Sequence, residues 1–344
     1  MSTVAAVILF IAIIGYSIFG GADFGAGFWD LTAGGTDRGQ RPREVIDHSI
    51  GPVWEANHVW LIFVFVVLWT CFPEAYASIM LTMFVPLSIA ALGVLLRGSS
   101  FAFRHAVLNT RDRRAFGAVF AASSVLVPYC FGAIAGGIAS GRVPDGGVAG
   151  DPVDGWVNPT SVLGGVLAVC AVAFLSATYL VFDAQRMSND AMVEYFRRRA
   201  IGAAIVTGTV GLVGVAVLSS DAEYLFDGLT SRGLVFVVVS ALCGLATLWL
   251  LTRSQHRGAR LMAIGAVTSV IVAWGVAQWD YLLPETLTVE AGAATSSTIW
   301  AVVIVTVLAV VFIFPAFGLL YTLDQRGLLP EEGVDEAEAA SPRG

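Results

Sequence analysis

Two short clusters of polar residues interrupt or border long apolar stretches. The first holds Asp23 in a glycine-rich run at 20–27, and the second holds Glu55, Asn57 and His58 at the start of another apolar stretch. Carboxylates and histidine can exchange protons. Ionisable groups within a membrane segment are costly and usually face protein or water. The pattern therefore favours a proton entry route or a buried hydrogen-bond network.

Each cluster also has a simpler interpretation. Asp23 could be a helix-end carboxylate that reaches interfacial water. Glu55 and His58 lie three residues apart on one helical face, so they could cap the helix and form a satisfied polar knot. Gly21 and Gly25 form a face of small residues that permits close helix packing. The residues alone leave these alternatives open.

Long apolar segments must position these side chains, and composition places the segments in a membrane. Hydrophobic residues make up 57% of the chain and charged residues 13%, whereas soluble domains have about 25% charged residues. A membrane-spanning helix needs about 20 apolar residues. We therefore expect an all-α polytopic membrane protein with nine transmembrane helices, at 4–29, 55–72, 77–97, 116–139, 160–183, 200–219, 233–252, 261–280 and 297–322.

The basic residues predict the orientation of these helices. All 19 are arginines; 17 lie in one alternating set of connections and two, Arg142 and Arg232, in the other. The positive-inside rule then predicts an external N-terminus and a cytoplasmic C-terminus. With this orientation Asp23 lies about 28 Å along its helix from Val4, at the inner membrane edge and level with Glu55. Arg97 ends the third span and is expected to snorkel to the inner surface.

Other features narrow the chemistry. Three prolines, Pro86, Pro128 and Pro315, should bend their spans. The four cysteines form no CxxC pair, so no metal site or disulfide is expected. Haem needs axial His, Met, Cys or Tyr. The four histidines are not paired with one another or with methionine, so we expect no haem held by this chain alone.

Residues 1–323 are expected to form the transmembrane helical domain, and residues 324–344 a disordered acidic cytoplasmic tail. The first span has no basic segment before it and no cleavage site after it, so we expect it to be retained. No nucleic-acid partner is expected.

Together the two clusters resemble subunit II of the cytochrome bd family of quinol oxidases. The resemblance rests on Gly-Ala-Asp-Phe-Gly-Ala-Gly, which ends at Gly27, and on Ser-Ile-Gly-Pro-Val-Trp-Glu-Ala-Asn-His-Val-Trp-Leu-Ile at 49–62. Weaker matches extend it over nearly the whole chain. They are Arg97 with Phe101-x-Phe103-Arg104, Ala177-Thr178-Tyr179-Leu180, Leu283-Pro284 before Leu287-Thr288, and Pro315 with Tyr321.

The resemblance implies two four-helix bundles plus one peripheral helix, in a bacterial plasma membrane. It implies a partner, subunit I, that holds haem b, haem d and the quinol site. This chain would be a scaffold without haem ligands that contributes to proton access and is inactive alone. Asp23 and Glu55 match acidic positions of the family, and Glu55 the one linked to proton conduction. Many members carry a carboxylate where this chain has Ala102, so the resemblance gives no support to a proton path there.

Two other classes of function compete with this interpretation. Nine spans with intramembrane acids would also suit a stand-alone proton- or solute-coupled transporter. A purely structural assembly subunit would make Asp23 and Glu55 dispensable. An oxidase subunit should co-purify with a haem protein, together with membrane lipid, quinone and any small accessory subunits, whereas a transporter should keep its form alone.

Overall fold

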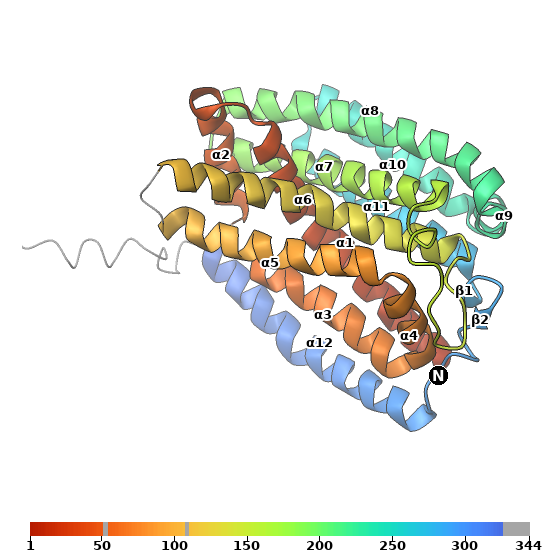
Figure 1. Ribbon diagram of the computed structural model, residues 1–344. Helices are drawn as coiled ribbons and strands as arrows, with labels where there is room; N and C mark the ends of the chain where they lie inside the picture. The colour runs from red at the N-terminus through yellow and green to blue at the C-terminus, as the bar shows by residue number, and fades with distance from the viewer. Residues whose placement is uncertain (51–53, 107–109, 326–344) are drawn as a thin grey trace, which may run out of the picture.

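The computed structural model describes residues 1–50, 54–106 and 110–325, without some side chains inside helices, Glu55 and Ala102 among them. Helices dominate these ranges, and one small two-stranded sheet accompanies them (Figure 1). The helices are α1 (Ser2–Thr32), α2 (Thr36–Ile50), α3 (Trp54–Cys71), α4 (Pro73–Thr82), α5 (Phe84–Ala106), α6 (Thr110–Ala139), α7 (Pro159–Arg186), α8 (Asp190–Asp221), α9 (Glu223–Thr230), α10 (Leu234–Thr252), α11 (His256–Gln278) and α12 (Ser296–Gln325); the strands are β1 (Tyr281–Leu283) and β2 (Leu287–Thr288).

The long helices form two bundles that share a boundary. In the first, α1 packs on α3 and α6, and α5 packs on α6; in the second, α7, α8, α10 and α11 pack on one another. Helix α7 contacts α1 and α6, which joins the bundles, and α12 lies at the edge against α3 and α1 (Figure 1). The expected all-α polytopic fold is therefore confirmed.

The predicted count of nine spans is approximate. Within the described ranges, seven helices are long and apolar enough to cross a membrane, and α3 with α4 would add an eighth, although these two are bent by 120° at Phe72. The predicted span 77–97 is divided at Met83 between α4 and α5. Pro86 explains the break, because it has no N–H for the Thr82 carbonyl and its ring crowds that group.

Three elements lie in segments that were predicted to be connections between spans. Helix α2 is mostly polar, so it carries no membrane-span signal, yet it buries Val45 and Ile46. Arg43 holds α2 to the end of α1, where its Nε donates to Asp30 Oδ1 over 2.6 Å. The other two are α9 and the β1–β2 hairpin, which lie together at the opposite end (Figure 1).

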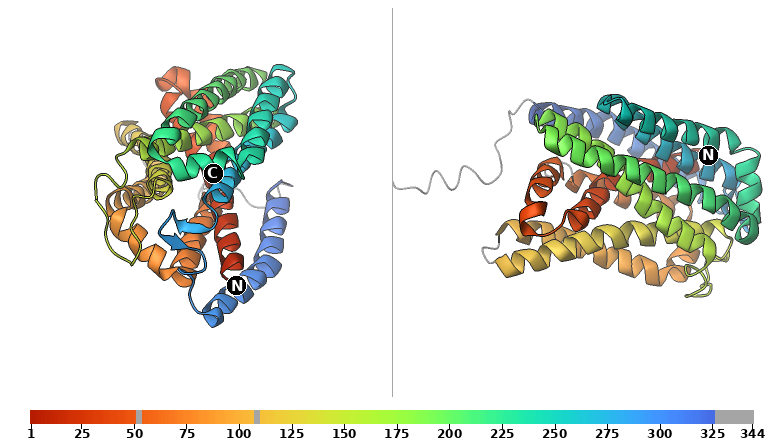
Figure 2. Two further views of the ribbon diagram at one scale, coloured as in Figure 1. Left: turned by 90° about the vertical axis from the view of Figure 1, so that its right-hand side faces the viewer. Right: turned by 90° about the horizontal axis from the view of Figure 1, so that it is seen from above.

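The two ends of the bundle differ in charge. Most of the arginines lie in α2, at the end of α5 and the start of α6, at the end of α7 and the start of α8, and around the α10–α11 turn. These segments lie at one end, which we call the arginine-rich end (Figure 1). The N-terminus, the 140–158 loop, α9 and the hairpin lie at the arginine-poor end, which faces the viewer in the left panel of Figure 2. The arginine-rich and arginine-poor segments therefore lie at opposite ends of the bundle, as their alternation along the sequence predicts. Which end faces the cytoplasm stays a prediction.

Candidate functional site

A buried ion pair between α1 and α5 is the main polar feature of the first bundle. Arg97 is 1% exposed and Asp23 is 6% exposed. Arg97 Nη1 donates to Asp23 Oδ2 over 2.9 Å, and Nη2 donates to Oδ1 over 2.7 Å and to the Asp23 carbonyl over 3.1 Å. Two parallel charge-assisted bonds are the strong geometry for arginine with a carboxylate. We call Asp23 and Arg97 the buried pair.

The rest of the Arg97 head group is also occupied. Its Nε donates to Ser124 Oγ of α6 over 3.0 Å. The Phe24 and Phe120 ring centroids lie 4.9 and 4.7 Å from its Cζ, within cation–π range. The prediction that Arg97 snorkels to the surface is therefore wrong. A partner 74 residues away in sequence satisfies it inside the protein.

The signal that could have found this pair was present in the sequence. The expected topology brings Asp23 and Arg97 to the same end of the first and third spans. Two opposite charges in apolar surroundings are commonly stabilised by pairing with each other. Spacing along the chain could not show that α1 and α5 face each other at this level.

The charges of the buried pair act on two further side chains, Tyr16 and His58. Tyr16 precedes Asp23 on α1. Its ring packs edge-on against the rings of Phe24 and Phe131, with centroid distances of 6.4 and 5.8 Å. Its hydroxyl is buried and has no hydrogen-bond partner among the described residues. Sequence reasoning missed Tyr16, because a tyrosine in an apolar helix reads as packing.

The predicted site residues fall into three groups. The charge of Asp23 acts on His58. Asn57 is 5% exposed on α3, beside His58 in sequence. Glu55 belongs to the first turn of α3, but its side chain lies outside the described residues. The joint role of these residues as one network stays a prediction.

Glycines allow α1 to approach its neighbours at this level. A Cβ on Gly25 would collide with the Val172 carbonyl and the Ser176 side chain of α7. A Cβ on Gly21 would lie 3.3 Å from Val172 Cγ1, a tight contact. Because small residues let helix backbones pack closely, this face joins α1 to α7 beside Asp23.

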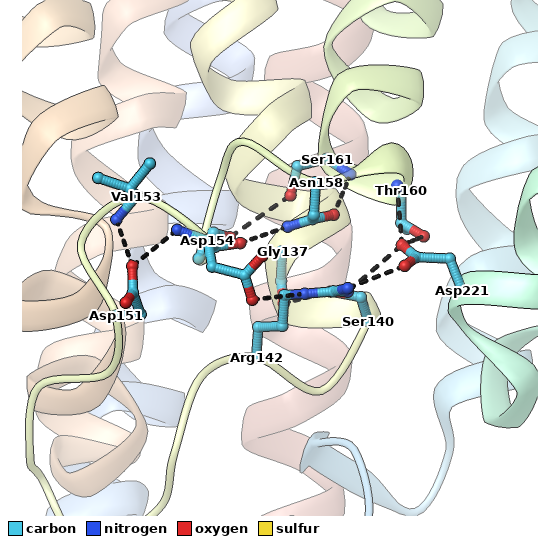
Figure 3. Close-up of polar contacts among 11 residues, drawn as sticks. Gly137, Ser140, Arg142, Asp151, Val153, Asp154, Asn158, Thr160, Ser161 and Asp221 are labelled. Carbon is cyan, nitrogen blue, oxygen red and sulfur yellow. Dashed lines mark hydrogen bonds and ion pairs between the residues drawn. The ribbon is translucent and has the colours of Figure 1, made fainter.

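Another arginine–aspartate pair lies at the arginine-poor end (Figure 3). Arg142 donates to both carboxylate oxygens of Asp221, over 2.8 Å from Nη2 and 3.3 Å from Nη1. Its Nε donates to Asp154 Oδ2 over 3.1 Å. The Thr160 N–H and hydroxyl donate to Asp221 Oδ2 over 3.0 and 2.6 Å. We call Arg142 and Asp221 the loop pair, because it ties the 140–158 loop to α7 and α8.

Electrostatics and turn hydrogen bonds stabilise this loop further. The hydrogen bond with Asp221 raises the pKa of the Arg142 guanidinium above its usual value. Backbone N–H groups of Asp154 and Val153 donate to Asp151, which lowers the pKa of that carboxyl. At α7, the Asn158 side chain accepts from the Ser161 N–H and so caps the helix (Figure 3).

Both arginines of the arginine-poor set thus have local partners. Arg142 forms the loop pair, and Arg232 donates to the Tyr224 hydroxyl and to the Ala277 carbonyl, each over 2.7 Å. These two exceptions to the charge pattern serve to hold loops and helix ends together.

No group of three or more His, Cys, Asp or Glu in the described ranges could hold a metal ion. Asp23 and Arg97, whose charges act on His58, pair with each other. Carboxylate, amide and histidine side chains are suited to proton transfer and to the stabilisation of charge.

Comparisons with known proteins agree on one family. The family model for cytochrome bd terminal oxidase subunit II matches residues 1–324. Cytochrome bd ubiquinol oxidase subunit 2 of Bacillus subtilis (strain 168) is 28% identical over 239 residues, which cover 69% of this chain and 67% of the relative. The putative cytochrome bd menaquinol oxidase subunit II of the same organism is 22% identical and covers 92% of this chain and 94% of the relative.

A solved structure shares the fold. The bd oxidase from Geobacillus thermodenitrificans contains a chain that superposes with a TM-score of 0.73 at 24% identity, covering 94% of this chain and 98% of that one. At this identity the likeness concerns the arrangement of helices. Because the family model covers nearly the whole sequence, the chain belongs to the cytochrome bd terminal oxidase subunit II family.

Proposed function

We propose that this chain scaffolds a haem-bearing subunit I and helps deliver cytoplasmic protons for the reduction of O2 to water. Family membership makes it a multi-pass membrane subunit of a quinol oxidase complex and implies subunit I as its partner. In the proposal, haem b, haem d and the quinol site belong to that partner. This chain is inactive and binds no haem without it.

The buried pair is the observation that carries the proposal. Two charges with almost no solvent contact cost free energy to bury, and they persist where structure or function needs them. Together they join α1, α5 and α6 near the arginine-rich end. In the proposed orientation this end faces the cytoplasm, from which protons for O2 reduction must come.

The roles of the acids differ within this network. Both carboxylate oxygens of Asp23 accept hydrogen bonds from Arg97, so Asp23 acts as a fixed charge that orders the site. Glu55 begins α3 at the same end and is our candidate for proton exchange. Asn57 and His58, which follow it on α3, hold or relay protons through hydrogen bonds.

The substitution Glu55→Gln in the whole complex tests the proton role. It keeps the shape of the side chain and removes the exchangeable proton, so we expect quinol oxidase turnover to fall by about tenfold or more with full haem content. Glu44→Gln is the matched control, because Glu44 is an exposed carboxylate on α2 at the same end. Full turnover across pH at full haem occupancy would show that Glu55 is structural. If haem content falls as well, Glu55→Asp is compared at matched haem occupancy.

Orientation has its own test. Thr110→Cys should react with an impermeant thiol reagent only from the cytoplasmic side, and Gly150→Cys only from outside. The reverse pattern would overturn the proposed topology.

Co-purification separates the oxidase subunit from the transporter alternative. Purification from the native membrane should give b- and d-type haem absorption bands, and the chain expressed without subunit I should be colourless. A stoichiometric haem band from the chain alone that disappears in His58→Ala would contradict the proposed division of labour. The comparisons favour the oxidase subunit, and no finding supports the transporter.

A further inference from the structure

A polar cavity of about 560 Å³ opens at the arginine-rich end of the second bundle, away from the buried pair. The last turns of α7 line one side with Phe182, Gln185 and Arg186. The α10–α11 turn and the start of α11 line the other with Gln255 and Arg257. The turn is tight, because Ser254 adopts a left-handed backbone conformation with φ of 57°. These two segments create a concave site between helices.

The cavity is positively charged. Arg186 and Arg257 are exposed, and neither forms an ion pair with a carboxylate among the described residues. Asp183 does not line the cavity but lies one helical turn before Arg186 on α7, and Arg186 and Arg260 both act on its charge. Helix α11 begins at the cavity without a side-chain cap, so its positive end adds to the field. The site therefore suits an anion.

Apolar surface borders the cavity on the side of the bundle. The Phe182 ring lies 5.9 Å from Arg257 Cζ and 5.4 Å from Arg260 Cζ. One helical turn after Arg257, Leu261 is 64% exposed. A ligand with a negative head and an apolar tail would meet both surfaces, whereas free phosphate would use only the first.

We propose that this cavity binds the phosphate-bearing headgroup of an anionic membrane lipid, with its acyl chain along the start of α11. Basic pockets between transmembrane helices recognise such headgroups. The lipid would bridge α7 and α11 where these helices leave the membrane. The proposal is independent of the proton role of Glu55 and of haem in the partner.

Lipid binding to the intact, delipidated complex tests the proposal. Native mass spectrometry would follow titration with phosphatidylglycerol, with phosphatidylcholine as the zwitterionic probe. We expect phosphatidylglycerol to bind about 30-fold more weakly to the Arg186→Gln/Arg257→Gln variant, since each arginine near an anionic lipid contributes about fivefold. Arg198→Gln is the matched control, because Arg198 lies at the same end and is 77% exposed. It should leave the affinity unchanged.

Further variants and competing ligands distinguish a bound lipid from free phosphate and from a protein contact. Arg186→Lys/Arg257→Lys keeps both charges and should retain most of the affinity, which guards against misfolding of the neutral variant. Equal affinity of the double Gln variant and the native complex would overturn the proposal. So would equal binding of phosphatidylcholine, or displacement of the lipid by millimolar inorganic phosphate. Loss of subunit I from the double Gln variant, with lipid binding unchanged, would assign the cavity to a protein contact instead.

Discussion

The buried pair and the loop pair use the same two residue types at opposite ends of the molecule, in different surroundings. Arg97 and Asp23 are 1% and 6% exposed, and two phenylalanine rings cover the guanidinium. The side chains of Arg142 and Asp221 are 25% and 15% exposed and face a surface loop. Water can replace a lost partner at the loop pair and cannot readily do so at the buried pair. The two sites should therefore respond very differently to the same change.

The partners also differ in what they join. The buried pair connects α1, α5 and α6, which belong to the first bundle. The loop pair holds the 140–158 loop against the ends of α7 and α8. Damage to the first should spread through the bundle, and damage to the second should stay local.

Arg97→Met should have the largest effect. It leaves the Asp23 carboxylate buried without its main partner, which costs about 3–5 kcal/mol of stability. Thermal unfolding of the purified complex would measure the loss. Asp23→Leu/Arg97→Met removes both charges and should recover most of it. A double variant no more stable than the single one would show that the surroundings, rather than the stranded charge, set the cost.

Gly25→Ala should come next. Its methyl group would meet the Val172 carbonyl, so α1 must move away from α7 near Asp23. Such overpacking costs about 1–3 kcal/mol. Gly244→Ala in α10 is the control, because a Cβ there meets nothing within 4 Å. If both variants melt alike, close packing of α1 does not support the buried pair.

Arg142→Gln should be milder. A partly exposed pair contributes about 1 kcal/mol or less. Hydrogen exchange should increase in 140–158 and at the start of α7, while the peptides around Asp23 stay protected. Global destabilisation as large as that of Arg97→Met would refute the contrast between the two sites.

Salt should produce the smallest difference. At 1 M ionic strength the screening length for exposed charges is about 3 Å, whereas buried pairs are screened much less. The stability difference between Arg142→Gln and the native complex should therefore shrink at 1 M salt, whereas the difference for Arg97→Met should persist. Equal attenuation of both differences would mean that water reaches the buried pair.

Much of the architecture follows from periodicity and charge. Apolar length predicts the helices, and Pro86 predicts a disturbance where α4 gives way to α5. Helix α2 was not predicted, because a polar helix with two buried apolar residues lacks the signal of a membrane span. The β1–β2 hairpin was not predicted, because its strands are only three and two residues long and show no clear alternation.

For the site, the sequence by itself determined which residues were unusual: an acid in a glycine-rich helix, and an acid, an amide and a histidine opening another. The cost of charge in an apolar segment makes such residues visible without a structure. Only the tertiary structure decided their partners. Arg97 turns inward because Asp23, Ser124 and two aromatic rings meet it there, and Tyr16 joins them from a position with no sequence signal. Contacts between helices depend on how each helix is rotated and placed, and no local pattern encodes that.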